Sequence, residues 1–179
     1  MIFTETSIMG AFIIDLDPFR DDRGFFARTF CEREFHDHGL VSRFVQCSFS
    51  QNVRRGVLRG LHYQTEPHGE TKLVRCTSGT IYSVIADLRP DSPTFKRWTS
   101  FELSQKNALS IYVPACVANG FQALTDGAEV AYQISEFYHP ESARGIRWDD
   151  PALGVEWPIM PPFLSERDAG LPNFNWGAA

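Results

Sequence analysis

Short segments in which apolar and polar residues alternate recur along most of the chain, and Gly, Pro and Asp turns separate them. Such alternation puts successive side chains on opposite faces of a strand. A short helix is expected over 31–38, where Phe35 is the strong apolar anchor and Gly39 is a natural C-terminal stop. Many short strands with so little helix predict an all-β fold, an antiparallel sandwich or barrel. The expected strands cover 11–15, 25–30, 44–51, 56–64, 72–76, 80–88, 96–103, 109–113, 120–124 and 129–137.

Turn signals and the C-terminal segment complete this outline. A polar turn is expected over 18–24, and Asp126-Gly127 is a strong hairpin signal between two strands. The segment 140–179 is rich in Pro and Trp, and we expect irregular structure there that packs back over the barrel and holds one short helix. No linker, repeat or low-complexity segment interrupts the chain, so we predict a single domain over 1–179.

The composition narrows the class of protein. A formal net charge of -5 argues against a general nucleic-acid binder, which needs a basic surface. No apolar run reaches about 18 residues, so no membrane span is expected, and the N-terminus lacks the basic start and apolar run of a signal peptide. The cysteines are far apart, which is typical of reduced thiols in a cytoplasmic protein. They are Cys31, Cys47, Cys76 and Cys116.

A cation, an imidazole and an amide gather at the end of one expected strand, in the segment 59–64, which reads RGLHYQ. This grouping suits the binding of an anionic substrate and the movement of a proton. Strict alternation gives His62 and Gln64 the same face as Leu58. It gives Arg59 the opposite face, unless the glycine that follows it bends the strand.

Tyr132 follows the same alternation within 129–134, so both it and His62 are expected to point into the barrel. The chain has no nucleophile motif and no phosphate-cradling glycine loop. Proton transfer is therefore the chemistry to consider. His62 is the natural general base, and a carboxylate such as Asp168 would fix its tautomer. Taken singly, each of these side chains could equally be a hydrogen-bonded core residue.

A metal site is not expected around His62. Small β-barrels often bind metals through closely spaced histidines, but the His-x-His spacing is missing here and position 119 is Asn119. His68 and Glu70 follow in a loop and make only a weak set with His62. We therefore predict no metal.

The segment 59–64 resembles the R-G-L-H-x-Q signature of the dTDP-4-dehydrorhamnose 3,5-epimerase family. One short motif would be a weak sign, but further segments match in order, and the resemblance runs from about residue 2 to residue 172. The matching segments are DRGFF at 22–26, KLVRC at 72–76 with Gly79, EVAY at 129–132, WDDP at 148–151 with Trp157-Pro158, and SERD at 165–168.

This resemblance implies a cupin-like jelly roll with short helices and an irregular C-terminal tail, in a homodimer that uses no metal or other cofactor. It also implies a nucleotide-diphospho-sugar substrate of the dTDP-4-dehydro-6-deoxyglucose type, whose 4-keto group acidifies the hydrogens on C3 and C5. By position, His62 is the base that removes such a proton, Asp168 orients it, and Tyr132 is the acid that returns a proton from the opposite side. The implied function is a cytoplasmic, cofactor-independent epimerase of deoxysugar biosynthesis.

The resemblance also implies substrate-binding positions. Arg23 and Arg59 suit the diphosphate, because a guanidinium can give two parallel hydrogen bonds to phosphate oxygens. Lys72 suits the keto oxygen, and Gln46 matches a further contact position. Candidate stacking surfaces for the nucleotide base are Phe19, Phe25 and Tyr138.

Several positions depart from the residues usual in the family. Asn119 stands for a His, Arg28 for a Glu, Ser48 for an Asn, Ala143 for a Glu and Arg167 for a Lys. The proton-transfer residues are retained, so the same chemistry is expected in an altered pocket. We count Arg28, Ser48, Asn119 and Arg167 among its expected substrate contacts.

Other interpretations remain open. Epimerisation can occur at C3, at C5 or at both carbons, and a 3,4-ketoisomerase on the same scaffold would also begin with proton abstraction beside a ketone. A sugar-nucleotide binding protein without turnover is a third interpretation, although a binder has no need of an acid and a base on opposite faces. A metal-dependent cupin oxygenase comes last, because the ligands for it are lacking.

Overall fold

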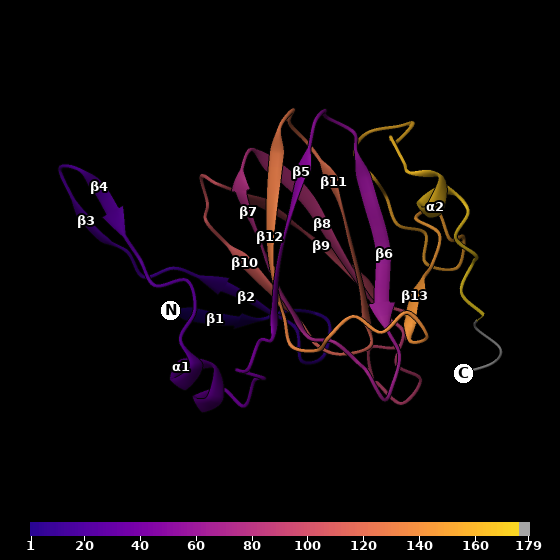
Figure 1. Ribbon diagram of the computed structural model, residues 1–179, viewed down its shortest axis with the longest axis horizontal. Coiled ribbons are helices and arrows are strands. Elements are labelled where there is room, and N and C mark those ends of the chain that lie inside the picture. Colours follow the sequence, from indigo (N-terminus) through magenta and orange to yellow (C-terminus); the bar gives the residue numbers. More distant parts are fainter. Residues whose placement is uncertain (176–179) are drawn as a thin grey trace.

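Two antiparallel β-sheets make up the body of the computed structural model, which describes residues 1–175 (Figure 1). In spatial order, the larger sheet consists of β1 (Ile2–Glu5), β2 (Phe12–Asp15), β10 (Ser110–Val113), β7 (Lys72–Ser78), β12 (Ala128–Ile134) and β5 (Gln46–Asn52). The smaller sheet consists of β13 (Ala143–Gly145), β6 (Leu58–Gln64), β11 (Val117–Ala123), β8 (Thr80–Asp87) and β9 (Trp98–Ser104). The prediction of an all-β jelly-roll sandwich is confirmed.

The main core lies between the two sheets and is formed by alternate residues of their strands. Ile81 and Ile85 of β8 are fully buried, as are Cys76 of β7 and Val130 of β12. Burial of one such side chain contributes about 1.5–3 kcal/mol. The alternation that predicts these strands therefore also supplies much of the energy that holds the sheets together.

The C-terminal segment covers the outer face of the smaller sheet. Its side chains Ile146, Leu153 and Trp157 pack against Leu58 of β6. The short helix α2 (Glu166–Ala169) lies within this segment, beside β6 (Figure 1). The predicted tail, which packs back over the sandwich and holds one helix, is thus confirmed up to residue 175, except that 143–145 form the strand β13. Residues 176–179 of that prediction lie outside the described residues.

Helix α1 (Glu32–Asp37) agrees with its prediction. Phe35 is its buried residue, and Gly39 follows the helix with a φ of +69° that suits glycine. β1 was not predicted, because most of its side chains are exposed and leave no apolar alternation. Among the described residues, no helix is long and apolar enough to cross a membrane.

A third, two-stranded sheet extends away from the sandwich as a hairpin of β3 (Phe19–Asp21) and β4 (Gly24–Phe26) (Figure 1). The predicted turn over 18–24 and the strand over 25–30 were wrong in their boundaries, since the turn is confined to 22–23. Phe19 and Phe26 are 76% and 75% exposed. Neither hairpin strand buries a face against the described residues, so alternation gave no signal for it.

Candidate active site

Strand β6 presents both Arg59 and His62 to one cavity, although they lie an odd number of residues apart. Its neighbour β11 pairs Asn119 with His62 but Phe121 with Arg59, so β6 holds one extra residue over this stretch. Such a β-bulge reverses the alternation of faces. The prediction that His62 shares a face with Leu58 was therefore wrong, because Leu58 packs under the C-terminal segment. The opposite face expected for Arg59 was wrong for the same reason.

Gly60 makes this bulge possible. Its φ is +114°, and a Cβ atom built there would lie 2.7 Å from the Cα of Gly120 and 2.8 Å from the carbonyl oxygen of Asn119. Only glycine combines that backbone conformation with so close an approach of a neighbouring strand. The glycine of the RGLHYQ segment thus determines where Arg59 and His62 point.

His62 and Asp168 form a short hydrogen bond, with 2.7 Å between His62 Nε2 and Asp168 Oδ1. Asp168 is buried at 5% exposure in α2, where its backbone N–H donates to Oγ of the N-cap Ser165 at 3.1 Å. Burial alone would raise the pKa of Asp168, but the hydrogen bond and charge of His62, with smaller effects from Gly60 N–H and Arg167, hold that pKa below its ordinary value. An ionised carboxylate can only accept, so Nε2 of His62 carries the proton and Nδ1 keeps a lone pair.

Tyr132 lines the same cavity from β12, in the opposite sheet. Its hydroxyl lies 3.4 Å from Oγ of Ser50. Burial raises the pKa of Tyr132 to about 12, against smaller lowering effects of the Ser50 hydrogen bond and the Arg59 charge. The phenol is therefore protonated at neutral pH and able to donate.

Lys72 reaches the cavity from the start of β7 and forms an ion pair with Glu70, with 2.8 Å between Nζ and Oε1. Both side chains are only 12% exposed. From the sequence, Glu70 was considered only as a weak metal ligand, and its place in the cavity was missed. The available signal was its spacing, because a residue two positions before Lys72 falls on the same side of an extended chain.

The cavity has a volume of about 400 Å³ and gathers most of the predicted site residues. Asn119 is buried there and donates from Nδ2 to the Val84 carbonyl oxygen at 3.3 Å. The predicted residues that line the cavity are His62, Tyr132, Asp168, Ser48, Arg59, Lys72, Asn119, Arg167 and Tyr138.

Three predicted substrate contacts lie elsewhere in this chain. Arg23 occupies the exposed turn of the β3–β4 hairpin and pairs with Asp21. Arg28 pairs with Glu34 of α1, with 3.4 Å between Nη1 and Oε1. Gln46 begins β5 opposite Ile134 and does not line the cavity. The sequence resemblance named these positions, but the fold of one chain does not bring them to His62.

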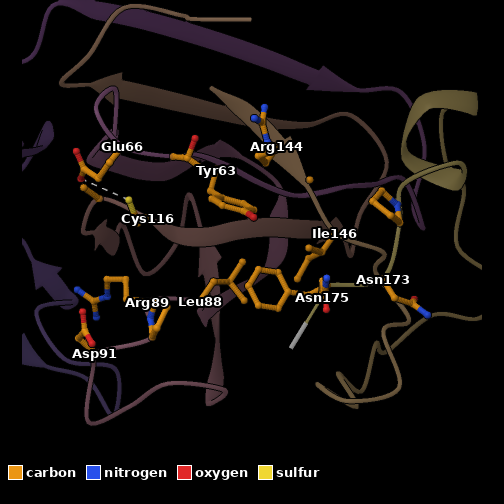
Figure 2. A pocket seen from close by; sticks show the side chains of 16 residues that line it. Tyr63, Glu66, Leu88, Arg89, Asp91, Cys116, Arg144, Ile146, Asn173 and Asn175 are labelled. Atoms are coloured by element: carbon orange, nitrogen blue, oxygen red, sulfur yellow. Dashed lines mark hydrogen bonds between the residues drawn. The ribbon is translucent and has the colours of Figure 1, made fainter. Parts of the chain in front are cut away.

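A second cavity, of about 800 Å³, lies on the other side of β6 (Figure 2). Figure 2 shows Tyr63, Leu88, Arg144 and Ile146 around it. Tyr63 follows His62 directly in β6 but packs on the outer face of the sheet. Although this cavity is larger, it lacks the histidine–carboxylate pair, so the smaller cavity is the candidate active site.

Comparison with known proteins gives consistent matches. A family model described as dTDP-4-dehydrorhamnose 3,5-epimerase matches residues 5–175. A protein of that description from Methanothermobacter thermautotrophicus is 48% identical over 158 residues, which cover 88% of this chain and 84% of that protein.

Two solved structures illustrate the same likeness. The dTDP-4-dehydrorhamnose 3,5-epimerase of Bacillus anthracis, solved with TDP and PPi bound, has a TM-score of 0.94 and 38% identity, and the match covers 97% of this chain and 99% of that one. A 3'-monoepimerase from Streptomyces bikiniensis in complex with dTDP-quinovose has a TM-score of 0.87 and 32% identity, over 94% of this chain and 85% of that one.

Proposed function

The chain belongs to the dTDP-4-dehydrorhamnose 3,5-epimerase family, and from this premise we propose how its side chains divide the reaction. It is an isomerase that acts on a dTDP-linked 4-keto-6-deoxy sugar in dTDP-rhamnose biosynthesis. One observation carries the assignment of roles. A buried carboxylate, Asp168, is hydrogen-bonded to His62 in a cavity that Tyr132 lines from the opposite sheet.

His62 acts as the general base in this proposal. The 4-keto group of the sugar acidifies the adjacent C–H bonds, and Nδ1 of His62 accepts the proton as the C–H electrons move into an enolate. The imidazolium that forms is stabilised by the Asp168 carboxylate, which stays ionised because its pKa is lowered. Such positioned proton transfer contributes about 100- to 10,000-fold to a rate.

Lys72 stabilises the enolate oxygen. Its ammonium group is held by Glu70 at 2.8 Å in a nearly buried position, so it is oriented before the substrate arrives. The carboxylate of Glu70 also balances the charge of Lys72. It offers a hydrogen-bond acceptor to a sugar hydroxyl.

Tyr132 returns the proton from the other side of the sugar ring. His62 belongs to the smaller sheet and Tyr132 to the larger one, so the two side chains approach the cavity from opposite walls. A proton removed on one side and returned on the other inverts the carbon. The retention of the phenol proton at neutral pH, with a pKa of about 12, supports this role.

Arg59 binds the diphosphate. Its Nε donates to Asn52 Oδ1 at 2.9 Å and its Nη2 to the Gln51 carbonyl oxygen at 3.3 Å, which fixes the guanidinium at the cavity wall. A guanidinium has five N–H donors, so others remain for phosphate oxygens. Ser48, Asn119 and Arg167 line the same cavity and complete the substrate contacts within one chain.

A homodimer accounts for the predicted contacts that one chain does not bring together. The β3–β4 hairpin extends from the sandwich with exposed Phe19 and Phe25 and with Arg23 at its turn (Figure 1). We propose that it packs on a second copy and brings Arg23 and these aromatic rings to the partner's cavity. Arg28 and Gln46 belong to the same proposed contact region.

The proposed mechanism uses only side chains of the protein. We propose, as the sequence predicts, that the enzyme is located in the cytoplasm. Within the described residues, all four cysteines are free thiols. They are Cys31, Cys47, Cys76 and Cys116.

Proton NMR of dTDP-4-keto-6-deoxyglucose in D2O tests the proposal, with His62→Ala as the control. We expect the wild type to exchange both the C3 and the C5 hydrogen for deuterium and the variant to exchange neither. Absence of exchange in the wild type would contradict the proposed function, and appearance of a 3-keto sugar would indicate a ketoisomerase instead.

Epimerisation at a single carbon is the second candidate. It is supported by the departures Asn119 and Arg28 from the usual residues and by the similarity to the 3'-monoepimerase from Streptomyces bikiniensis. Loss of only one of the two proton signals in the same experiment would establish it.

A further inference from the structure

Two loops beside the candidate active site bring together three side chains that suit a metal ion. His68 lies in the loop before β7, and Glu136 and His139 lie in the loop that follows β12. Their ligand atoms all lie within 4.8 Å of one another, and each side chain is partly buried. None of the three has a role in the proposed reaction.

The buried amide of Gln64 holds both loops in place. Its Nε2 donates to the carbonyl oxygens of His68 at 3.0 Å and of Phe137 at 3.1 Å. Its Oε1 accepts the backbone N–H of His139 at 2.7 Å. Gln64 is 1% exposed, so one rigid side chain of β6 fixes the backbone on both sides of the cluster. The backbone that carries the cluster is therefore fixed by the fold.

The hydrogen bond at Nδ1 of His139 leaves Nε2 of the same ring available to bind a metal ion. Its Nδ1 lies 3.1 Å from Oε1 of Glu141, and because a carboxylate only accepts, Nδ1 carries the proton. Nε2 then has a lone pair, and it faces Oε1 of Glu136 at 3.8 Å. A lone pair and a carboxylate that face each other have no hydrogen to share, whereas a cation between them binds both. A carboxylate bonded to the far nitrogen is the usual support of a metal-bound histidine.

His68 supplies the third donor. Its ring stacks on that of His139, with 3.5 Å between ring centroids and 11° between planes. The stack keeps the two imidazoles, the ring type that most commonly binds metals, in direct contact. Imidazole binds a metal through its in-plane lone pair, so one ring must turn out of the stack. The ligand atoms must also approach to roughly 3.4 Å, as tetrahedral Zn²⁺ requires at about 2.0–2.1 Å per bond.

We propose that His68, Glu136 and His139 form a binding site for a divalent transition-metal ion, with Zn²⁺ as the best match to two imidazoles and one carboxylate. The site lies outside the reaction. It connects the loop that leads to Lys72 with the loop that carries Tyr138, and both of these residues line the candidate active site. A bound ion would tie together the two loops at the rim of that cavity.

Isothermal titration of Zn²⁺ into the chelator-treated wild-type protein tests this site without any use of its activity. We expect a single Zn²⁺ ion per chain. His68→Ala and His139→Ala should each weaken binding by about tenfold or more, and Glu141→Gln by about 10- to 100-fold through loss of support for His139. His36→Ala is the matched control, because His36 lies exposed on α1 away from the cluster, and its Kd should equal that of the wild type.

Two further measurements exclude misfolded variants and cysteine ligands. In the wild type, Zn²⁺ should shift the imidazole ¹⁵N NMR signals of His68 and His139 and leave that of His36 unchanged. The spectrum with Co²⁺ should show a nitrogen–oxygen site without a thiolate charge-transfer band. The proposal is overturned if no binding occurs, if the His68 and His139 signals do not move, or if a thiolate band appears.

Discussion

Asp168 controls which nitrogen of His62 carries a proton, since its carboxylate can only accept a hydrogen bond. An amide at this position could donate instead and would stabilise the opposite tautomer. We expect Asp168→Asn to lower the rate of C–H exchange by about 100- to 10,000-fold, the usual contribution of a positioned base. Deuterium exchange followed by NMR measures this rate. Binding of dTDP, measured by titration, should stay near the wild-type value, and equal exchange rates would contradict the assignment.

In the proposed mechanism Tyr132 acts after the enolate has formed, and this order gives a distinct kinetic signature. We expect Tyr132→Phe to retain deuterium exchange, because His62 remains, but to lose most of the inverted product. The phenol has a pKa of about 12 and lies in the wall opposite His62, so its removal takes away the proton donor on that face. Comparison of the exchange rate with the epimerisation rate on one sample measures the difference. A variant that matches the wild type in both would exclude Tyr132 as the acid.

At the residue scale, the residue types of the candidate site were predictable from the sequence and their geometry was not. His62 stood out as a base, but Asp168 lies far from it in the chain, and only the docking of α2 against β6 brings them together. Glu70 was missed because it reads as an ordinary loop acid. Its importance appears only when Lys72 is found beside it in the cavity.

Strand β6 depends on its glycine bulge, and this dependence is testable. In Gly60→Ala the new methyl group would lie 2.7 Å from the Cα of Gly120, at a backbone φ of +114°. We expect the free energy of unfolding to fall by about 3 kcal/mol or more, measured by urea denaturation. Gly154→Ala is the control, because its φ is +62° but nothing lies within 4 Å, and it should lose only about 1 kcal/mol. Similar losses in both variants would mean that the close strand approach matters little.

The end of β8 is held by a buried carboxylate, Asp87, which accepts hydrogen bonds from Arg89 at 2.8 Å and from the hydroxyls of Ser92 and Thr94 at 2.6 Å each. Burial alone would raise the pKa of Asp87, but these hydrogen bonds outweigh it and lower the pKa to about 2. A lowered pKa stabilises the fold above the ordinary value near 3.8, and this contribution is lost as pH falls through about 2.

Asp87→Asn should therefore lower the free energy of unfolding by about 2 kcal/mol at pH 7, and the difference from the wild type should shrink as the pH falls from 4 toward 2. Urea denaturation at several pH values measures it. Asp91→Asn in the same loop is the control, since Asp91 is exposed and should change little. A deficit that is independent of pH would show that the charge of Asp87 is not the cause.

At the element scale, strands that bury at least one face were predicted well and those that bury none were not. Inward residues of β12 fill the core, and β8 is rich in β-branched residues and buried on both faces. The edge strands β1 and β13 and the β3–β4 hairpin bury too little surface to leave a pattern. The bulge in β6 was suggested by its glycine, but its effect on the direction of Arg59 depends on β11, which is distant in sequence.

At the scale of the whole molecule, Arg23 and the exposed aromatic rings of its hairpin do not line the candidate active site of their own chain. The proposed dimer would place them at the active site of the second chain. In such a dimer each active site takes His62 from one chain and Arg23 from the other. We expect His62→Ala and Arg23→Ala to be poorly active alone and to regain activity when they are refolded as a mixture, because one site per mixed dimer is intact. Light scattering gives the mass, and the epimerase assay gives the recovery.

The control for this mixture is His62→Ala combined with Asp168→Asn. Both changes lie in the same half of the site, so no mixed dimer of these two variants contains an intact site. Recovery with Arg23→Ala but not with Asp168→Asn would support the exchange of the hairpin between chains. No recovery in either mixture would mean that Arg23 has no role in the partner's cavity.

The extent of the domain, 1–179, stays a prediction.

The base and the acid of the proposed reaction belong to different sheets. The spacing between the two sheets therefore sets the distance between these two groups. Face-to-face sheets lie about 10 Å apart, and buried residues such as Ile81 and Val130 act as the spacers between them. A change of one methyl group in that interior would alter the gap that a sugar ring must fill, without touching the sugar. Evolution toward a new substrate therefore has a route through the packing of the core as well as through the lining of the cavity.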